Sequence, residues 1–274
     1  MKPMSLVVRI VALGLASIAI ARAASEDVPF ITTPDVVTVT MLQIARVNAQ
    51  DYVIDLGSGD GRIVITAARQ FGARGLGVEI VPELVKRSRD NAVAAGVEAR
   101  AEFRDEDLFK TDLARATVVT LYLLPEVNLE LRPKLLALKP GTRVVSHDWD
   151  MGDWPPDRSV TVDVPNKQIG LEKTSKVHLW IVPARLNGAW CGTGRARKAT
   201  LQVDQKFQTL RATLTRGDKR HSFDARVRGG QVQSVDGDLV VNAEGDRLKP
   251  VVARGPFADF RGVTFSRRHG DSCS

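Results

Sequence analysis

The side chains that most often hold metal ions are scarce in this chain of 274 residues. It contains four histidines and two cysteines, and they occur nowhere at the spacing of a zinc or iron site. Compositional bias is absent as well, because hydrophobic residues make up 43% of the chain and charged residues 26%. These values are close to the globular average and exclude disordered, collagen-like and coiled-coil classes. A globular protein that is long enough to bury its own core remains.

An apolar run long enough to span a membrane is also missing at the N-terminus. The unbroken apolar stretch 10–20 has 11 residues, whereas a spanning helix needs about 20. Lys2 and Arg9 precede this stretch, and an Ala-Arg-Ala segment follows with the small residues that a signal peptidase requires. We predict that residues 1–23 are a cleaved signal peptide and that the mature protein, starting at about Ala24, is exported to the periplasm. An N-terminal membrane anchor is the alternative.

Charge differs between two parts of the chain. The formal net charge is +7, which by itself would suggest a nucleic acid or another anionic partner. Residues 24–184, however, carry 19 basic and 23 acidic side chains, whereas residues 185–274 carry 17 basic and 9 acidic ones. A change of this kind indicates a domain boundary near residue 185. We therefore predict two domains, 24–184 and 185–274, and no nucleic-acid partner.

The two cysteines bracket the second domain. Cys191 lies near its start and Cys273 one residue from its end. In an oxidising compartment this pair could close the domain as a disulfide, which the chain-entropy account values at about 4 kcal/mol. Export therefore favours the bond, and two free thiols are the alternative.

Residues 24–184 alternate between short apolar runs and amphipathic stretches. A first helix is expected, with Thr33 as its cap, Pro34 at its first position, and Val37, Met41 and Ile44 on its apolar face. Strands are then expected at 52–56, 75–80, 101–104, 117–123 and 142–147, and helices at 62–71, 82–95 and 125–138. Two further strands, 159–164 and 176–182, have no helix between them and predict an antiparallel edge. The predicted fold class is α/β, doubly wound, with a mainly parallel seven-stranded sheet.

A glycine-rich loop follows the first of these strands. Gly57, Gly59 and Gly61 allow the backbone to approach a ligand, and the following helix offers unpaired N–H groups. Asp55 stands two residues before the Gly-x-Gly-x-Gly pattern. Dinucleotide loops favour Gly-x-Gly-x-x-Gly and have no acid so close to a pyrophosphate. An anionic Asp55 suits a cationic ligand such as the sulfonium and ammonium of S-adenosylmethionine.

Two more acids lie where a nucleoside needs hydrogen-bond acceptors. Glu79 ends the second strand, where it can accept bonds from both ribose hydroxyls. Asp107 follows the third strand and can accept a bond from an adenine amino group. In the simpler alternative, Glu79 caps a helix and residues 105–107 form a solvated acidic turn.

At these motifs the sequence resembles a known family. Residues 52–148 are similar to class I, seven-strand S-adenosylmethionine-dependent methyltransferases, with 53–61 as the first motif and 77–79 as the second. A finer similarity is carried by Thr33-Pro34, Asp60-Gly-Arg62 and Leu121-Tyr-Leu-Leu-Pro125 with Asn128. These residues resemble a branch of protein-lysine methyltransferases that includes the enzyme of the ATP synthase c subunit and, more distantly, the non-SET histone-lysine enzyme. The resemblance implies a Rossmann-like domain, S-adenosylmethionine as methyl donor and a lysine ε-amine as acceptor.

The predicted donor-binding residues are Thr33, Asp55, Gly57, Ser58, Gly59, Gly61, Glu79, Asp107 and Leu123. Enzymes that methylate adenine or planar amides carry an Asn/Asp-Pro-Pro-Tyr/Phe motif after the fourth strand. Here Leu123-Leu-Pro-Glu126 stands in its place, which disfavours those acceptors.

The acceptor side needs few reactive groups. Methyl transfer from a sulfonium requires alignment, exclusion of water and removal of a proton from the amine. Tyr122 and Leu123 can line an apolar channel, with Glu126 and Asn128 at its mouth, and His147 could act as a base. The predicted catalytic residues are therefore Tyr122, Glu126, Asn128 and His147. In the alternative, these are a strand-end aromatic, polar residues at the start of a helix and a packed histidine.

The basic region 185–274 has a different pattern. Short alternating runs at 201–207, 221–227, 239–241, 251–253 and 263–265 are separated by tight turns. This pattern predicts an antiparallel meander that closes into a small barrel. Its arginines alternate with apolar residues and so indicate a solvated outer face, while docking to anionic envelope lipid or to the substrate protein is the alternative.

Together these features predict an exported methyltransferase that uses S-adenosylmethionine and acts on a protein lysine. Two alternatives remain open. The acceptor could be a small molecule, or the chain could be a non-catalytic envelope-binding protein with a residual donor pocket.

Overall fold

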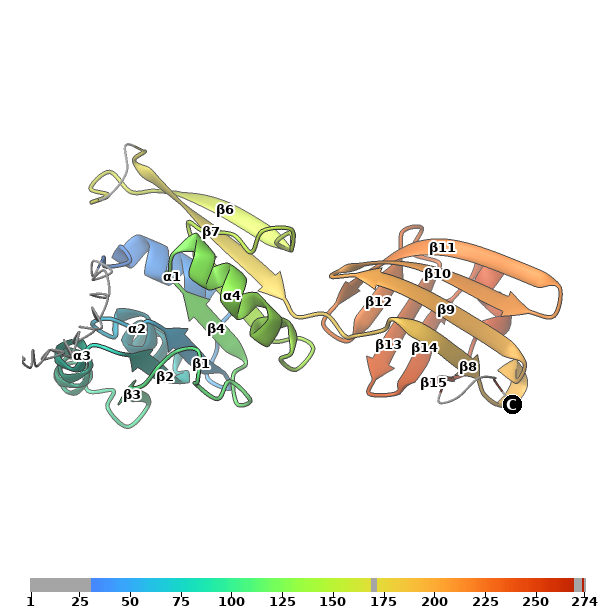
Figure 1. The fold of residues 1–274 in the computed structure, drawn as a ribbon, viewed down its shortest axis with the longest axis horizontal. Coiled ribbons are helices and arrows are strands. Elements are labelled where there is room, and N and C mark those ends of the chain that lie inside the picture. Colours follow the sequence, from blue (N-terminus) through green and yellow to red (C-terminus); the bar gives the residue numbers. More distant parts are fainter. Residues whose placement is uncertain (1–30, 169–171, 269–272, 274) are drawn as a thin grey trace, which may run out of the picture. The chain divides into compact units, whose positions relative to one another are not determined.

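The computed structural model describes residues 31–168, 172–268 and 273. The predicted signal peptide lies outside these residues. The described strands form two sheets, a seven-stranded mixed sheet and an eight-stranded closed barrel (Figure 1). The predicted domain boundary falls in the segment 182–187 that joins them, and the division into domains stays a prediction. Within the described ranges, no helix combines the length and apolar character that a membrane crossing requires.

The mixed sheet has the strand order β3-β2-β1-β4-β5-β7-β6, and its strands agree with the seven predicted ones. Their bounds are β1 Tyr52–Leu56, β2 Arg74–Glu79, β3 Ala101–Asp105, β4 Val118–Leu121, β5 Arg143–His147, β6 Arg158–Asp163 and β7 Thr174–Ile181. β7 is antiparallel to both of its neighbours, β5 and β6. The predicted α/β class and its antiparallel strand pair are therefore confirmed. The strand order reverses between β1 and β4, which is where open α/β sheets place their ligands.

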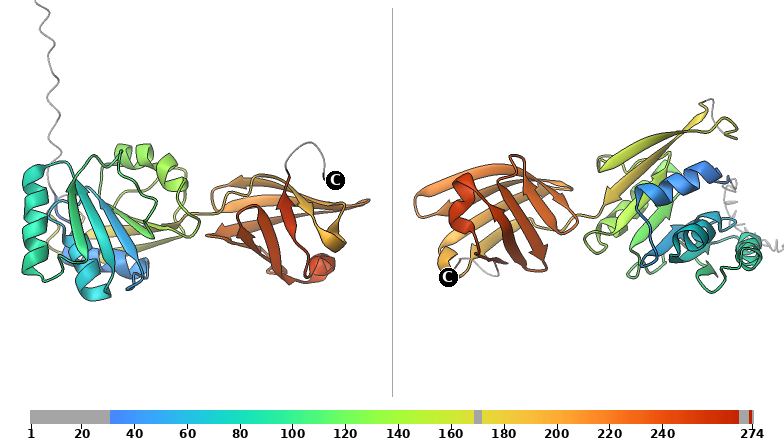
Figure 2. Two further views of the ribbon diagram at one scale, coloured as in Figure 1. Left: turned by 90° about the horizontal axis from the view of Figure 1, so that it is seen from below. Right: turned by 180° about the vertical axis from the view of Figure 1, so that it is seen from behind.

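Four helices of the described chain cover the two faces of this sheet (Figure 2). They are α1 Asp35–Ile44, α2 Arg62–Phe71, α3 Pro82–Ala94 and α4 Pro125–Leu136. Alternate residues of β1 explain why both faces are buried. Val53 packs with α1 and α2 in one apolar cluster, and Ile54 and Leu56 pack with α4 in another.

The first helix begins one residue later than its cap pattern predicts. Pro34 has φ −57° and ψ 146°, an extended conformation, so it is the residue before the helix rather than its first residue. Thr33 is therefore one position too far out, and no side-chain cap forms. The predicted apolar face is confirmed, because Val37, Met41 and Ile44 are buried.

The closed barrel has the strand order β10-β11-β12-β13-β14-β15-β8-β9. Its elements are β8 Gly188–Gly192, η1 Gly194–Ala196, β9 Ala199–Lys206, β10 Thr209–Arg216, β11 Lys219–Arg228, β12 Gln231–Ser234, β13 Leu239–Glu244, β14 Arg247–Ala253, η2 Gly255–Phe260 and β15 Phe265–Arg267. The predicted meander and barrel are confirmed. Three strands, β8, β10 and β12, are absent from the prediction, because small or polar residues weaken their apolar signal.

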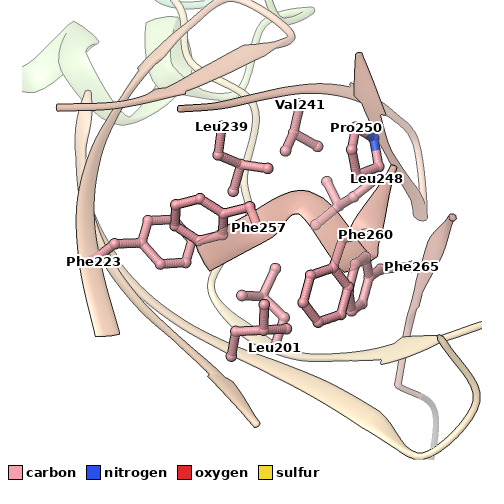
Figure 3. A pocket seen from close by; sticks show the side chains of 10 residues that line it. Leu201, Phe223, Leu239, Val241, Leu248, Pro250, Phe257, Phe260 and Phe265 are labelled. Carbon is pink, nitrogen blue, oxygen red and sulfur yellow. The ribbon is translucent and has the colours of Figure 1, made fainter. Parts of the chain in front are cut away.

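The interior of the barrel is a packed core. Figure 3 shows Phe257 and Phe260 of η2 among the apolar side chains that point inward, together with Leu201, Leu239 and Phe265. The cavity that they leave measures about 20 Å³ and is lined by apolar atoms. That volume corresponds to about one water molecule, so the side chains fill the barrel as eight-stranded barrels allow.

A disulfide joins Cys191 of β8 to Cys273, with 5.3 Å between the Cα atoms. The predicted pairing is therefore confirmed. The bond closes a loop with a sequence separation of 82 residues, which includes β9 to β15.

Candidate active site

The glycine loop between β1 and α2 folds back onto β2. The N–H groups of Gly57 and Ser58 both donate to the carbonyl oxygen of Val78, at 3.0 and 2.9 Å, and Gly61 N donates to Ser58 O at 2.9 Å. Gly57, Gly59 and Gly61 have φ values of 73°, 53° and 82°. L-residues rarely adopt this left-handed region, so glycines set the shape of the loop.

Close packing around the loop leaves no room for larger residues. A Cβ at Gly57 would lie 2.9 Å from Leu123 Cδ2, and a Cβ at Gly61 would lie 2.6 Å from the Phe103 ring. Leu123 follows β4, so the predicted donor-binding residues Gly57 and Leu123 are brought together. The Ser58 hydroxyl is buried and has no hydrogen-bond partner among the described residues. An orphaned polar atom at this loop fits a ligand that would satisfy it.

Asp55 lies on β1 directly below the loop and is buried. Thr120 Oγ1 of β4 donates a hydrogen bond of 2.6 Å to its Oδ1. Burial raises the pKa of Asp55 to about 7, the Thr120 bond opposes this rise, and the nearby charges of Glu79 and Asp60 add to it. The carboxyl group is therefore ready to lose its proton when a cation binds beside it.

Glu79 lies at the carboxyl end of β2, as predicted, and its carboxylate holds two segments. Oε2 accepts a hydrogen bond of 3.0 Å from Gly59 N, and Oε1 accepts bonds from the N–H groups of Ile80 and Val81. Glu79 thus orders both the glycine loop and the residues that lead into α3. Asp107 follows β3 in a turn in which its Oδ1 accepts a bond from Phe109 N.

Arg62 joins the segment before α1 to the glycine loop. It belongs to the Asp60-Gly-Arg62 motif but was not among the predicted site residues. Arg62 Nη1 donates a hydrogen bond of 2.9 Å to the Thr33 carbonyl and lies 3.7 Å from Asp35 Oδ1. Thr33 is buried. The predicted donor-binding residue Thr33 is therefore held against the start of α2.

The predicted acceptor-side residues come from the ends of β4 and β5 and from α4. The rings of Tyr122 and His147 are stacked, with 3.9 Å between their centroids. Asn128 is fully buried, and its Nδ2 donates to Ser146 Oγ at 3.2 Å. Glu126 is exposed in the first turn of α4, and none of the described hydrogen bonds or ion pairs joins it to the other three.

Some buried polar atoms of the candidate site lack hydrogen-bond partners among the described residues. In the described ranges, six buried side-chain polar atoms lack a hydrogen-bond partner, and three of them are Ser58 Oγ, Asn128 Oδ1 and His147 Nδ1. Buried polar atoms without partners are uncommon in native proteins, and a ligand or water that binds there is one explanation. The loop that only glycines can form, the orphaned Ser58 hydroxyl and the buried acid together fit S-adenosylmethionine.

Comparisons with known proteins agree with this site. The model of the ANTKMT methyltransferase domain matches residues 55–158. A protein-lysine N-methyltransferase of Saccharolobus islandicus is 45% identical over 141 residues, which cover 51% of this chain and 88% of that protein. The lysine N-methyltransferase of the ATP synthase c subunit from Mus musculus is 40% identical over 108 residues. The chain spans 43% of the length of the mouse protein, and the match covers 39% of this chain.

Among solved structures, an RNA methyltransferase from Salinibacter ruber in complex with S-adenosyl-L-homocysteine is 53% identical, with a TM-score of 0.52. The match covers 57% of this chain and 96% of that one. The fold, the glycine loop and these similarities define a class I methyltransferase that uses S-adenosylmethionine as methyl donor. Within this class, the chain belongs to the protein-lysine N-methyltransferase family that includes the Saccharolobus enzyme. The predicted family, enzyme class and cofactor are confirmed.

Proposed function

We propose that this methyltransferase modifies the ε-amine of a lysine in a protein. The observation that carries the proposal is the arrangement of acceptor-side residues at the ends of β4 and β5. Leu123 contacts the glycine loop, and Tyr122 beside it stacks on the buried His147. Support comes from the Saccharolobus relative, which is named a protein-lysine N-methyltransferase and is matched over 88% of its length.

The chain's own residues would align and desolvate the amine. When bound, S-adenosylmethionine supplies a methyl group already activated by a sulfonium. A lysine must reach it as a neutral amine, and an apolar surrounding favours that form because burial disfavours the ammonium. Tyr122 is half-buried, and burial raises its pKa, so its hydroxyl stays protonated. Tyr122 and Leu123 would therefore exclude water, and proximity would provide most of the rate.

Transfer of a labelled methyl group tests the proposal. We expect the full-length protein to move tritium from S-adenosylmethionine to proteins of the cell envelope, and acid hydrolysis to release the label as methyl-lysine. Asp55→Asn should abolish labelling. Asp90→Asn, which changes an exposed aspartate of α3 paired with Lys86, is the matched control and should leave labelling unchanged. If Asp55→Asn transfers as much label as the wild-type protein, the proposal that S-adenosylmethionine binds beside Asp55 is wrong.

RNA is the second candidate acceptor, because the similar Salinibacter protein is named an RNA methyltransferase. Two observations favour protein instead. Residues 24–184 carry more acidic than basic side chains, and Leu123-Leu-Pro-Glu126 replaces the motif of adenine methylation. Digestion of the labelled product separates the candidates, because protease should release the label and nuclease should not. Label in small metabolites alone would identify a small-molecule acceptor.

We also propose that the protein is exported, as its N-terminal sequence predicts. The Cys191–Cys273 disulfide supports this, because disulfides persist in oxidising compartments. N-terminal sequencing of the protein from the periplasmic fraction should find a start at about Ala24. Recovery of unprocessed protein in the cytoplasm contradicts export, and processing-resistant protein in the membrane fraction indicates an N-terminal anchor.

Contact of the barrel region with an anionic envelope surface is a further part of this proposal. Residues 185–274 carry 17 basic side chains against 9 acidic ones. Flotation with vesicles that contain phosphatidylglycerol should recover the protein at low salt and lose it at high salt. Failure to float at low salt would contradict contact with the anionic surface. It would indicate that the basic side chains form a solvated outer face.

A further inference from the structure

Two side chains of the hairpin β6–β7 reach the acceptor side, and neither was predicted to be functional. Ser175 Oγ lies 2.9 Å from Nε2 of His147, and both side chains are 1% exposed. Lys167 Nζ donates hydrogen bonds of 2.8 Å to Asp148 Oδ2 and of 2.7 Å to Thr174 O. Ser175 therefore holds His147, and Lys167 holds Asp148, at the carboxyl end of β5.

Asp148 has an unfavourable backbone conformation that the same hairpin stabilises. Its φ is 62°, in the left-handed region that residues other than glycine seldom adopt. Asp148 N donates to Lys176 O at 2.7 Å, and Asp148 Oδ1 accepts a bond of 2.8 Å from Lys176 N. Together with the Lys167 ion pair, β7 and its preceding loop hold Asp148 by three bonds. Such conformations persist where the surroundings fix them, and they gather at functional sites.

His147 supports the ring of Tyr122. The two rings stack at 3.9 Å with 29° between their planes, and His147 is buried beneath a half-buried tyrosine. Both ring nitrogens of His147 are inside the protein, with Nε2 at Ser175 and Nδ1 without a partner among the described residues. The imidazole could therefore affect an acceptor beside Tyr122 only through the Tyr122 ring. Its effect on the reaction would therefore be indirect.

Burial keeps the His147 ring uncharged, and three ionisable groups lie around it. They are Tyr122 at the end of β4, Asp148 next to it in the chain and Lys167 from the hairpin. Burial is the largest cause that lowers the pKa of His147, to about 4, while Asp148 raises it and Lys167 lowers it. A charged imidazolium would place a positive charge near the sulfonium of the methyl donor. A neutral ring avoids that repulsion.

We propose that Lys167 and Ser175 are positioning residues, which act through Asp148 and His147 to hold the Tyr122 ring in place at the acceptor side. The inference rests on the proposed acceptor position beside Tyr122. Lys167 balances the charge of Asp148, and Ser175 fixes the orientation of the imidazole. The hairpin β6–β7 thereby controls the acceptor side without touching the acceptor.

Histidine titration by NMR tests the charge balance without any acceptor. In the full-length protein, the ring signal of His147, assigned by its loss in His147→Gln, should stay in the neutral form down to about pH 5. Lys167→Met should raise the pKa of His147. Each pKa unit changes the protonated fraction of His147 by up to about ten-fold at a given pH. Lys167→Arg should restore the original titration. An unchanged titration in Lys167→Met overturns the role of Lys167.

A matched control removes a lysine of the same kind elsewhere. Lys86 forms an exposed ion pair of 2.6 Å with Asp90 on α3, so Lys86→Met should leave the His147 titration as it is. A shift of the same size in Lys86→Met would show that the effect is not local and would overturn the role of Lys167. Because no methyl acceptor is used, this experiment can succeed even if the lysine acceptor proves wrong.

Kinetics test the consequence for the reaction. Lys167→Met should lower kcat, and the loss should be larger at pH 5 than at pH 8, with the Kd of S-adenosylmethionine unchanged. Ser175→Ala should lower kcat at every pH, and Ser175→Thr, which keeps the hydroxyl, should restore it. Equal loss of kcat and donor affinity would indicate general damage to the fold and overturn the positioning role. An unchanged kcat in Ser175→Ala would remove Ser175 from the proposal.

Discussion

Arg62 holds the carboxylate of Asp60 with two nitrogen atoms, at 3.0 Å from Nε to Oδ1 and 2.7 Å from Nη2 to Oδ2. Its third guanidinium nitrogen donates to the carbonyl of Thr33. One side chain therefore joins three segments, which are the glycine loop, the start of α2 and the chain before α1. This fork geometry is specific to arginine, because a lysine cannot bond both carboxylate oxygens and a carbonyl in one plane.

Loss of Arg62 should weaken donor binding. Arg62→Met leaves Asp60 and the Thr33 carbonyl without their donor, and a partly buried group that loses its partner costs about 1–3 kcal/mol. We expect the Kd of S-adenosylmethionine to rise about ten-fold in calorimetry. Arg69→Met, at the exposed end of the same helix, should leave the Kd unchanged. An Arg62→Met protein with wild-type affinity would show that the clamp has no part in binding the donor.

The stability of the donor-free protein should depend on Asp55 in a defined pH window. The pKa of Asp55 is about 7 in the folded protein against an ordinary value of 3.8. Between these values the unfolded chain has lost this proton while the folded protein keeps it. The contribution of Asp55 to the free energy of unfolding is therefore largest below about pH 4 and decreases as the pH rises to about 7. Denaturant unfolding of Asp55→Asn should lack this decline. The same decline in wild type and variant would assign it to other groups.

Donor binding should release a proton near pH 7. A sulfonium beside Asp55 favours the carboxylate, so affinity for S-adenosylmethionine should increase as the pH rises through about 7. Calorimetry in two buffers with different ionisation enthalpies measures the proton released. S-adenosylhomocysteine lacks the sulfonium charge and should release less. Equal release for both ligands would mean that Asp55 does not sense the sulfonium.

The disulfide should stabilise the barrel and leave catalysis unchanged. Replacing Cys191 and Cys273 together by serine removes a link across 82 residues, and the chain-entropy account values such a link at about 4 kcal/mol. Denaturant unfolding should show the loss, while methyl transfer at low temperature should continue. Mass spectrometry of the non-reduced protein provides the direct check, because alkylation of both cysteines without reduction contradicts the bond.

Asn128 should act mainly through the segment after β5. Its Nδ2 donates to the carbonyls of Trp149 and Asp150, at 3.4 and 3.3 Å, in addition to Ser146. Asn128→Ala leaves these acceptors unpaired, and we expect a loss of about 1–3 kcal/mol in unfolding free energy. Asn242→Ala on the outer face of the barrel is the control. If stability is unchanged and only turnover falls, Asn128 contacts the acceptor directly.

Local sequence patterns were sufficient to predict the elements of the mixed sheet. The alternation of apolar runs and helical stretches located its seven strands, and prolines 82 and 125 marked where α3 and α4 begin. The positions of Asp55 in β1 and of Glu79 at the end of β2 were predicted because their distance from the glycines follows from strand and loop lengths. In the barrel, β10 escaped prediction because Ala212 and threonines replace larger apolar residues along its inner and outer faces.

Contacts between distant segments could not be read in this way. Thr120 pairs with Asp55 because β1 and β4 lie in parallel register. Thr120 is the only polar residue in the apolar run 118–121, and this could have indicated that it has a buried polar partner. Ser175 and Lys167 reach the end of β5 because β7 runs antiparallel beside it. No spacing rule links residues 28 positions apart, as His147 and Ser175 are. Their relation depends on the packed sheet.

In the barrel, the first strand and the last are hydrogen-bonded neighbours, since Trp190 of β8 pairs with Arg267 of β15. The chain therefore enters and leaves this cylinder at adjacent points, about 5 Å apart across one strand pair. A body whose two ends lie side by side can be gained, lost or moved between host proteins at a single position. The closed geometry of the described barrel therefore needs no strand from the mixed sheet.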